Sequence, residues 1–400
     1  MPGNGKRLRK TIRRTGGGVI GTGTYGCVFR PALRCKGNIT RRNGKISKLM
    51  RSNQADDEFQ QKTLFEPINA RQNYFLYPEE LCEPELPFEA SNMVNDCKSN
   101  NNDDVDNTNK LLLLSSDGGQ PLSNINFITP NNIYPFFESL TNIFEGLSLA
   151  HNAGIAHMDV KPANMVIKAV GPKLLTRLID FGLSVKIDTV PVLASMKDNK
   201  FHDYLLFMTN YPYWSPDLRF ANPSYAEDLL KKNKEQQLER LAKDYTDPKV
   251  RLSKLVSYTE PQLIDNDYAD YFHLMNTGRF SPPFFNPNGQ YKLNHEWALD
   301  ISDKLYDLSL EERLNIIFTK NDVFGLGQSL FVIFSRVLEF LSSDYPVLAY
   351  KMTNSFYSSF SFLYVNMTNP DPFQRFDIKA ALNFYKNTVL ADIAQALRFK

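Results

Sequence analysis

The chain has little net charge, few cysteines and no long hydrophobic run. Its 46 Lys and Arg residues nearly balance its 44 Asp and Glu residues, which leaves a formal net charge of +2 over 400 residues. No global field would therefore draw it to nucleic acid or to an anionic membrane. Apolar runs such as LLLL at 111–114 are far too short to span a bilayer. The basic N-terminus is not followed by an apolar stretch, so we expect no signal peptide.

The cysteines argue against a metal or disulfide framework. The four residues Cys27, Cys35, Cys82 and Cys97 form no CxxC pair and have no nearby pair of histidines. This spacing disfavours a zinc site, and a disulfide framework is not expected in so long a chain. We therefore expect reduced thiols in an intracellular protein.

The positive charge that exists is local. Residues 6–14 read KRLRKTIRR, at the end of a predicted N-terminal tail at 1–14. One interpretation is a tail that only keeps the chain in solution. The other is a docking arm for acidic partners or nucleic acid, and the sequence leaves both open.

The first part of the chain has the character of strands. Glycine-centred alternation around residues 16–30 predicts a hairpin, and apolar stretches at 44–50 and 110–116 predict further strands. Asp and Glu near its start and Pro near its end predict a helix over 54–66. An Asn- and Asp-rich stretch at 94–110 has almost nothing to bury, which predicts a flexible surface loop.

Helical spacing dominates the second part. Apolar residues recur at helical intervals over 133–154, and Gly154 is a typical stop signal. The stretch at 323–341 is apolar almost all round, which predicts a buried helix. A long charged and Tyr-rich segment at 222–318 includes a further predicted helix at 226–245. Strands followed by helices predict an α+β protein with two lobes, at 15–119 and 120–400.

A glycine-rich stretch lies in the predicted hairpin. IGTGTYGCV places Gly21, Gly23 and Gly26 in a G-x-G-x-x-G-x-V pattern. Glycines let the backbone approach phosphate oxygens, to which peptide N–H groups can donate. A dinucleotide site would need a helix opening on these glycines, whereas CVFRPAL favours a second strand and contains Pro31. The pattern therefore predicts a flap across a nucleotide, with Cys27 as a small residue at the pocket edge whose thiol is buried and inert.

A lysine in an apolar strand needs a partner. Lys48 lies between Ile46 and Leu49, where an unpaired charge raises the free energy of the fold. The acidic helix that follows offers Glu58 as the best partner. Glu66, which adjoins Pro67 at the end of that helix, is the reserve candidate.

These motifs occur in the order found in eukaryotic-type protein kinases, a family that nearly the whole chain resembles. GTGTYGCV is similar to the glycine-rich loop of the family, and LLLLSSDGG to the strand and hinge that contact adenine. HMDVKPAN at 157–164 resembles the catalytic loop, DFG at 180–182 the metal-binding triplet, and SPD at 215–217 the A-P-E motif. DVFGLG at 322–327 resembles the start of the central buried helix.

The resemblance implies a fold and a set of roles. The fold would be kinase-like, with a small β-rich N-terminal lobe and a larger, mainly helical C-terminal lobe into which 222–318 is inserted. Asp159 would orient the substrate hydroxyl, Lys161 would offset charge on the γ-phosphate, and Lys48, held by Glu58, would bind the other phosphates. The implied ATP-binding residues are Ile20, Gly21, Thr22, Gly23, Thr24, Tyr25, Gly26, Val28, Ile46, Lys48, Leu113, Ser115, Asp117 and Val166.

The implied metal is Mg²⁺, held by Asn164 and Asp180 as hard oxygen ligands. DVKPAN resembles the Ser/Thr version of the catalytic loop, so we expect transfer from ATP to Ser and Thr hydroxyls of protein substrates. Two alternatives are a pseudokinase scaffold that binds partners without turnover and a small-molecule kinase of related fold. Small-molecule kinases usually depart from the DVKPAN and DFG patterns.

Two departures from the family pattern carry predictions. Met158 stands where the family often has an arginine that pairs with a phosphate on the activation segment, and Met cannot form that pair. We therefore predict activity without phosphorylation of this segment, although Thr189, Ser195 and Thr209 lie in it. Asp217 replaces the usual Glu, and we predict that it forms a buried pair with a late arginine, Arg375.

Two wider features remain. The segment at 222–318 is much longer than the family needs, and it is either a docking platform or an elaborate surface. Three stretches also resemble the kinases of large DNA viruses: KISKLM, EPINARQNYFLYPEELCEP and NYPYWSPD. A viral origin would place the protein in the host cytoplasm and in the virion.

Overall fold

The computed structural model describes residues 18–23, 26–37, 44–69, 72–85, 110–125, 128–189, 213–221, 301, 304–305 and 307–398. Four predicted segments lie wholly or mostly outside the described residues: the tail at 1–14, the loop at 94–110 apart from Lys110, the helix at 226–245 and most of the insertion at 222–318. The chain divides into two compact units, one formed by Met1–Gln60 with Tyr77–Asp117 and the other by Gln61–Leu76 with Gly118–Lys400.

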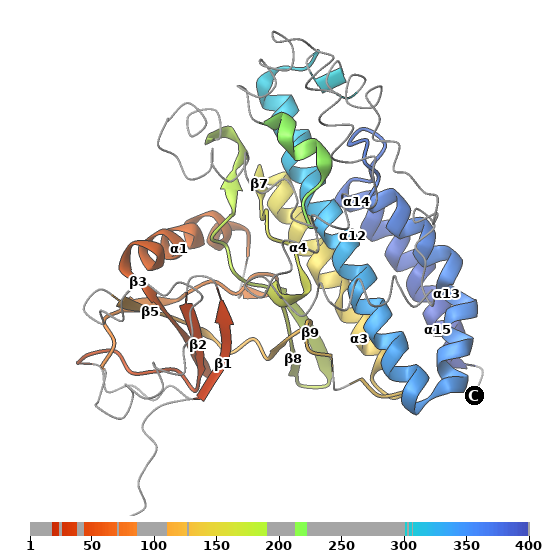
Figure 1. Ribbon diagram of the computed structural model, residues 1–400, viewed down its shortest axis with the longest axis horizontal. Helices are drawn as coiled ribbons and strands as arrows, with labels where there is room; N and C mark the ends of the chain where they lie inside the picture. The colour runs from red at the N-terminus through yellow and green to blue at the C-terminus, as the bar shows by residue number, and fades with distance from the viewer. Residues whose placement is uncertain are drawn as a thin grey trace, which may run out of the picture. The chain divides into compact units, whose positions relative to one another are not determined.

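The first unit is built on a five-stranded antiparallel sheet with the strand order β1-β2-β3-β5-β4 (Figure 1). The predicted hairpin is formed by β1 and β2, with a bulge between Val19 and Gly21. The strands predicted at 44–50 and 110–116 are β3 and β5. The bounds are Gly18–Gly23 for β1, Gly26–Arg30 for β2, Lys45–Arg51 for β3, Glu80–Cys82 for β4 and Lys110–Ser116 for β5.

Alternation along the strands gives this sheet two different faces. One face carries a buried cluster that includes Cys27, Phe29 and Leu49. The other carries Met50 and Leu113, which pack with Ala55 and Phe59 of α1, Ser52–Phe65. Helix α1 begins and ends within two residues of the predicted helix at 54–66.

The prediction that Cys27 lies at the edge of the nucleotide pocket is wrong. Cys27 is paired in register with Leu49 and belongs to the same buried cluster. Lys48, which comes just before Leu49 on β3, points to the opposite face and is paired with Val28. Because the side-chain period of a strand is two, Cys27 cannot share a face with Lys48.

The prediction of reduced thiols is also wrong. Cys35 and Cys82 form a disulfide with a Cα–Cα distance of 5.7 Å, and Cys27 is disulfide-bonded as well. Cys35 follows β2, and a bridge from Cys35 to Pro84 lays its segment beside the end of β4. The two cysteines are 47 residues apart in the sequence, so only the pairing of the strands brings them together.

In the second unit, the single helix predicted at 133–154 is two helices. The range 133–154 forms α3, Ile133–Ser139, and α4, Thr141–Asn152, which are separated at Leu140. Gly154 has a φ of +68°, a left-handed conformation that ends the helix and favours glycine. The second unit also contains two small sheets, with strand orders β6-β8-β9 and β10-β7. Their bounds are Gln120–Pro121 (β6), Ile155–Ala156 (β7), Met165–Val170 (β8), Lys173–Leu178 (β9) and Val185–Lys186 (β10).

The helix predicted at 323–341 is longer than expected. It is α12, Leu310–Asp344, and it starts at a capping box in which Ser309 and Glu312 each accept a hydrogen bond from the other's backbone N–H. The predicted end of the insertion at 318 therefore lies inside this helix. Figure 1 shows α12 alongside α13, and α13 packs against α15. The remaining bounds are Pro346–Met367 (α13), Ile378–Phe384 (α14) and Leu390–Arg398 (α15).

Helix α12 is the one helix of the described residues that is long and apolar enough to cross a membrane by length and composition alone. However, 89% of its most apolar window is buried inside the protein. A helix that is apolar all round and covered by other helices is typical of a protein core.

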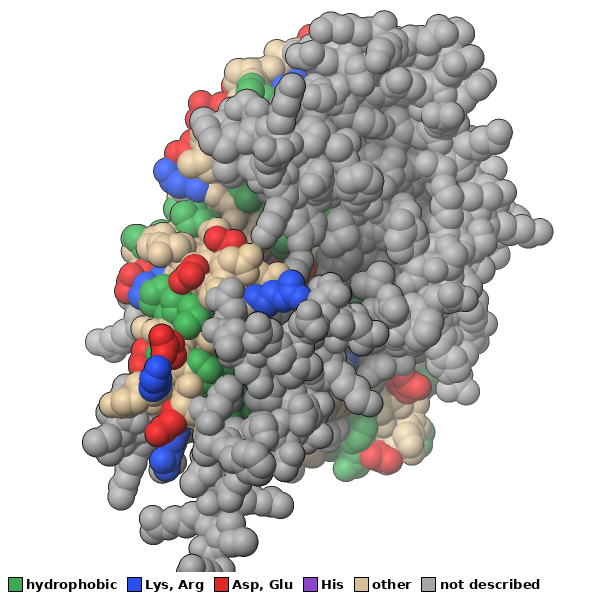
Figure 2. Space-filling view, turned by 60° about the vertical axis from the view of Figure 1, so that its left-hand side comes forward, with side chains coloured by type: hydrophobic (Ala, Val, Ile, Leu, Met, Phe, Trp, Pro, Cys, Tyr) green, Lys and Arg blue, Asp and Glu red, His purple; other side chains and the backbone are tan. Residues whose placement is uncertain are grey.

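The predicted α+β fold class is confirmed, since a strand-rich first part is followed by a mainly helical second part. On the face seen in Figure 2, acidic and basic side chains are interspersed over the described surface. This mixture agrees with the small net charge.

Candidate active site

The predicted catalytic loop is held at its start by a buried carboxylate. Asp322 in α12 accepts backbone hydrogen bonds from His157 (2.7 Å) and Met158 (2.8 Å), and its Oδ2 lies 3.1 Å from His151 Nε2. Met158 has a φ of +66°, an unusual conformation for a residue other than glycine. The two bonds to Asp322 hold the backbone in this conformation, so the loop leaves β7 in a fixed direction.

Two predicted catalytic side chains and one predicted metal ligand meet in this loop. The amide nitrogen of Asn164 donates to Asp159 Oδ2 at 2.7 Å and to the Asp159 carbonyl at 3.0 Å. Lys161 Nζ lies 3.3 Å from the same carboxylate oxygen. Asp159 and Asn164 are both buried, so these contacts fix the carboxylate in one position. Because the amide nitrogen makes both bonds, the amide oxygen is the atom of Asn164 that can serve a cation.

The DFG triplet adjoins this loop through the main chain. Ile179 donates its backbone N–H to the carbonyl of Asn164 at 3.0 Å, so the two proposed metal ligands, Asn164 and Asp180, lie on neighbouring segments. Asp180 has a φ of +65°, a second strained backbone position. Such strain clusters at functional sites, where the surroundings hold it in place.

A cluster of aromatic rings supports the triplet. Phe181 is buried, and its ring centroid lies 4.5 Å from that of Phe65 and 5.3 Å from that of His157. Phe75 packs against Phe65 at 4.8 Å. The cluster therefore brings together Phe65 at the end of α1, Phe75 in the segment that follows it, and Phe181 of the DFG triplet.

His157 stays neutral in this cluster. Its ring is fully buried, and burial lowers its pKa, although the nearby carboxylates of Asp322, Asp159 and Asp180 oppose this shift. Nδ1 accepts a hydrogen bond from the Asp159 N–H at 3.3 Å. The neutral ring therefore carries its proton on Nε2.

Met158 takes part in an uncharged network with the end of the activation segment. Its sulfur accepts a hydrogen bond from Asn321 Nδ2 at 3.7 Å, and its carbonyl accepts one from the indole N–H of Trp214 at 2.7 Å. Asn321 Oδ1 in turn accepts from the Ser215 backbone N–H at 2.9 Å. All four residues are buried, so neutral hydrogen bonds occupy the position where the family often has an arginine.

The predicted pair between Asp217 and Arg375 is confirmed. Arg375 NH2 lies 2.6 Å from Asp217 Oδ1, and both side chains are 0% exposed. Arg375 also donates to the carbonyls of Asn369 (2.7 Å) and Lys320 (3.1 Å). The guanidinium therefore connects the segment that carries Asp217 to α12 and to the chain that follows α13.

In the first unit, Lys48 is paired with Glu58 rather than Glu66. Lys48 Nζ lies 2.6 Å from Glu58 Oε2, and the two side chains are 19% and 10% exposed. Glu66 begins a short 3-10 helix, Glu66–Ile68, beyond α1. On β3, Ile46 is paired with Ser115 and Lys48 with Leu113.

The remaining predicted nucleotide residues take several positions. Gly21, Thr22 and Gly23 lie on β1 together with Ile20, which is 47% exposed, whereas Thr24 and Tyr25 lie outside the described residues. A Cβ at Gly26 would come within 2.2 Å of the Leu49 carbonyl, so only glycine fits there. The Asp117 carboxylate pairs with Arg30 at 2.6 Å. In the second unit, Val166 is buried against Gly118.

Sequence reasoning did not assign roles to Asp322, Asn321 or Trp214. A usable signal for Asp322 was present, because a carboxylate in an otherwise apolar helix must be paired when it is buried. No comparable signal identified Asn321 or Trp214. Their contacts with Met158 join residues that are far apart in the chain.

One family model and several known proteins match parts of this chain. Residues 122–204, which include Asp159, Lys161, Asn164 and Asp180, match the protein kinase domain. MAP3K epsilon protein kinase 1 of Brassica napus is 38% identical over 72 residues, 17% of this chain and 5% of that protein. Mitogen-activated protein kinase sma-5 of Caenorhabditis elegans is 30% identical over 113 residues, 26% of this chain and 21% of that protein.

Among solved structures, the PknI kinase domain of Mycobacterium tuberculosis is 20% identical, with coverage of 41% of this chain and 58% of that one. Its TM-score of 0.24 is too low to bear on the fold. The curated matches span only 5% and 21% of the relatives' own lengths. The matched part of the chain, which contains the predicted catalytic loop and the DFG triplet, is similar to the protein kinase domain.

Proposed function

We propose that the chain is an ATP-dependent protein kinase that transfers the γ-phosphate to Ser and Thr hydroxyls of protein substrates, without phosphorylation of its activation segment. The observation that carries this proposal is the buried arrangement of Asp159 with Asn164 and Lys161. Phosphoryl transfer requires little covalent chemistry from a protein, and catalysis depends on positioning and on stabilising charge.

Asp159 is the group that orients the nucleophile. Its carboxylate accepts a hydrogen bond from the substrate hydroxyl and takes up the hydroxyl proton as the phosphoryl group is transferred. The bond from Asn164 at 2.7 Å fixes the orientation of the carboxylate. Lys161, 3.3 Å from the same oxygen, places a positive charge where the γ-phosphate develops negative charge.

The donor set fits Mg²⁺ and the phosphates of ATP. The carboxylate of Asp180 and the amide oxygen of Asn164 are the hard oxygen ligands that Mg²⁺ prefers. When bound, Mg²⁺ neutralises charge on the phosphate oxygens. Lys48, which Glu58 holds in place at 2.6 Å, offers its ammonium group to the α- and β-phosphates.

Transfer by a matched pair of variants tests this proposal. Asp159→Asn should lower transfer to peptides by about 10²–10⁴-fold, the range typical for loss of a proton-transfer group, while ATP binding stays nearly unchanged. Asp344→Asn is the control, since Asp344 is an exposed residue at the end of α12. Equal transfer by wild type and Asp159→Asn would support the pseudokinase scaffold instead.

The same measurement on a peptide array identifies the acceptor. We expect phosphate on Ser and Thr peptides, because the loop resembles the Ser/Thr version at Lys161. Phosphate on Tyr peptides alone would contradict this specificity. Transfer to a small-molecule hydroxyl with none to any peptide would support the small-molecule kinase.

The independence from phosphorylation rests on the neutral network around Met158. An arginine in this position needs a phosphate partner to offset its buried charge. Met158, Asn321 and Trp214 instead fix the end of the activation segment with neutral hydrogen bonds. Trp214 and Ser215, at the end of this segment, are therefore held in place before any modification.

Loss of the Asn321 amide tests this role. Asn321→Ala removes the acceptor of the Ser215 N–H and leaves that buried donor unsatisfied, at a cost of about 1–3 kcal/mol. We expect peptide transfer to fall by about tenfold or more, with KM for ATP unchanged because only the peptide-binding segment is released. Asn387→Ala, which removes an exposed amide, is the matched control. Equal activity of the two variants would argue against the network.

Three further proposals come from the sequence. The resemblance to kinases of large DNA viruses predicts a host cytoplasmic location and presence in the virion. The basic tail at 1–14 is a candidate docking arm for acidic partners or nucleic acid. The insertion at 222–318 is either a docking platform or an elaborate surface. All three stay predictions.

A further inference from the structure

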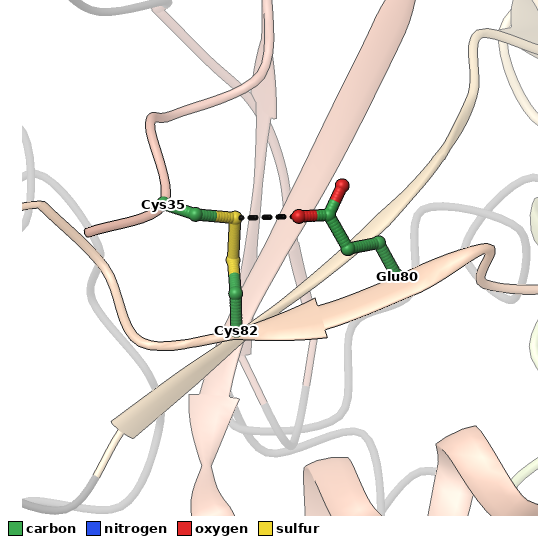
Figure 3. Close-up of side chains that lie close together, drawn as sticks. All are labelled: Cys35, Glu80 and Cys82. Carbon is green, nitrogen blue, oxygen red and sulfur yellow. Dashed lines mark hydrogen bonds between the residues drawn. A yellow bond between two sulfur atoms is a disulfide. The ribbon is translucent and has the colours of Figure 1, made fainter. Parts of the chain in front are cut away.

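Two cysteines and a carboxylate converge beside β4 in the first unit. Glu80 and Cys82 are two residues apart on β4, so their side chains leave the same face of the strand. Cys35 reaches them from the segment after β2, as Figure 3 shows. The sulfur of Cys35 lies 3.3 Å from Glu80 Oε1. The three potential ligand atoms all lie within 4.8 Å of one another.

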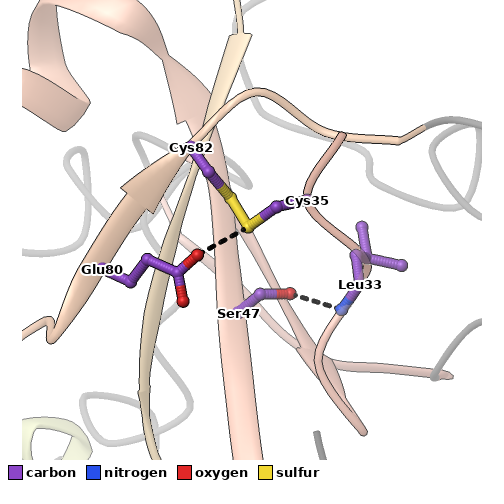
Figure 4. Close-up of a disulfide and its surroundings, with 5 residues drawn as sticks. All are labelled: Leu33, Cys35, Ser47, Glu80 and Cys82. Carbon is purple, nitrogen blue, oxygen red and sulfur yellow. Dashed lines mark hydrogen bonds between the residues drawn. A yellow bond between two sulfur atoms is a disulfide. The ribbon is translucent and has the colours of Figure 1, made fainter. Parts of the chain in front are cut away.

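The backbone holds these side chains together without help from the disulfide. Lys36 donates its N–H to the Glu83 carbonyl at 2.9 Å, and Glu85 donates to the Arg34 carbonyl at 2.7 Å. Leu33 donates its N–H to Ser47 Oγ at 2.9 Å, which ties the same segment to β3 (Figure 4). The cysteines would therefore remain close after the S–S bond is broken.

The contact between sulfur and carboxylate is one of packing in the disulfide form. A disulfide sulfur carries no hydrogen, and an ionised carboxylate only accepts hydrogen bonds. At 3.3 Å the two atoms are in van der Waals contact while the disulfide is intact, and they form no hydrogen bond. The contact becomes favourable when Cys35 is a thiol that donates to Glu80, or when a cation lies between a thiolate and the carboxylate.

The distances suit a tetrahedral cation. Zn²⁺ binds sulfur at about 2.3 Å and carboxylate oxygen at about 2.1 Å, so tetrahedral angles place S and O about 3.6 Å apart and the two sulfurs about 3.8 Å apart. The present S–O separation of 3.3 Å is already close to this value. The Cα–Cα distance of 5.7 Å leaves room for the sulfurs to separate by rotation about the side-chain bonds.

We propose that the reduced form of Cys35 and Cys82, together with Glu80, binds a thiophilic divalent cation of the Zn²⁺ class. Two thiolates favour such an ion over Mg²⁺ and Ca²⁺, which prefer oxygen ligands. Three protein ligands leave the fourth position to water. Cys35 is 2% exposed, whereas Glu80 and Cys82 are only partly buried, so an ion can enter from their side. The site is independent of kinase activity.

The two forms are related by a balanced exchange. One thiolate of a dithiol reductant attacks the disulfide, the S–S bond breaks, and the second thiol of the reductant releases the mixed disulfide. Two electrons pass from the dithiol, which ends as a disulfide, and its two protons end on Cys35 and Cys82. Binding of the cation then releases both protons as the thiols become thiolates.

Zinc content of the full chain tests the site. The protein is reduced with a phosphine under exclusion of oxygen, mixed with Zn²⁺, and desalted before its zinc is measured by mass spectrometry. We expect wild type to retain one equivalent more zinc than Cys35→Ser. The matched control is Cys97→Ser, which should retain the wild-type amount. Wild type that has not been reduced should also lack the extra equivalent of zinc, because two sulfurs in an S–S bond cannot act as thiolate ligands.

A carboxylate pair of variants tests the third ligand. Glu80→Gln should bind zinc at least about tenfold more weakly, as expected when a metal site loses a ligand or its support. Glu83→Gln is the control, since Glu83 forms only an exposed pair with Lys36. Co²⁺ in place of Zn²⁺ should show the visible absorption of a tetrahedral thiolate site in wild type. Equal zinc in reduced wild type and Cys35→Ser would overturn the proposal, as would equal affinity in Glu80→Gln and Glu83→Gln. The second comparison holds even if Cys35→Ser does not fold.

Discussion

The two charged pairs that the sequence predicted lie in different units and differ in their surroundings. Lys48 and Glu58 in the first unit are 19% and 10% exposed, whereas Asp217 and Arg375 in the second are 0% exposed. Lysine is a compact charge on a flexible stem, and arginine is a planar fork with fixed donor directions. The fork of Arg375 also serves the carbonyls of Asn369 and Lys320.

This difference in exposure indicates different roles for the two ion pairs. Asp217 and Arg375 join three segments of the second unit, and no solvent reaches them. Their pair is suited to holding the fold. Lys48 keeps some exposure, and Glu58 keeps its ammonium group in place on β3. That pair is suited to presenting a charge to a ligand.

The largest effect on the free energy of unfolding should come from Arg375. Arg375→Met leaves the Asp217 carboxylate buried without its partner, which should lower the free energy of unfolding by about 3–5 kcal/mol. Urea unfolding followed by tryptophan fluorescence measures this loss. Lys386→Met is the control, since it removes an exposed pair with Glu145, worth about 0–1 kcal/mol. Similar losses in both variants would remove the distinction between the two pairs.

A smaller loss of stability and a large loss of activity should follow from Lys48→Met. Glu58 would lose a partner in a partly buried position, which should lower the free energy of unfolding by about 1–3 kcal/mol. Transfer should fall by at least about 10²-fold, because the phosphates of ATP lose the ammonium group that would bind them. Lys45→Met is the control on the same strand, since Lys45 pairs with Glu79 at a more exposed position. If Lys48→Met kept its activity, the pair would serve the fold alone.

The smallest effect should be a pH dependence that comes from His157. Burial lowers its pKa in the folded state, while the unfolded value is about 6.5. Below about pH 6.5 the unfolded chain therefore binds a proton that the folded chain does not. The free energy of unfolding should decrease by up to about 1.4 kcal/mol per pH unit as the pH falls through this window, and be fully regained above it.

His157→Phe isolates this contribution, since it keeps a ring beside Phe65 and Phe181 and removes the titrating group. The difference between the unfolding curves of wild type and variant should flatten above pH 6.5. A difference that does not change between pH 5 and 7 would show that His157 does not lose its proton on folding.

Local pattern was enough to predict much of the fold. The strand around Lys48, the helix that carries Glu58 and the buried helix that contains Asp322 each have a period that is visible in a short window. The start of α12 was missed by more than ten residues, although Ser309 and Glu312 form a capping box that short motifs can identify. The break at Leu140 between α3 and α4 had no such signal.

Contacts between distant residues were harder to predict. The pair of Asp217 with Arg375 could be predicted only because each residue occupies a position that resembles a motif of the kinase family. The disulfide between Cys35 and Cys82 could not be predicted, because it depends on how β4 lies beside the segment after β2. The bonds from Asp322 to the catalytic loop likewise join residues more than 160 positions apart.

The proposed function requires that this loop transfers phosphate without a phosphorylated activation segment. The most direct measurement is the initial rate of peptide phosphorylation by phosphatase-treated wild type, with treated Asp159→Asn beside it. We predict that treated wild type keeps the rate of the untreated enzyme and exceeds the variant by about 10²-fold or more. If the untreated enzyme were active but treated wild type were no faster than Asp159→Asn, activity would depend on a phosphorylated activation segment.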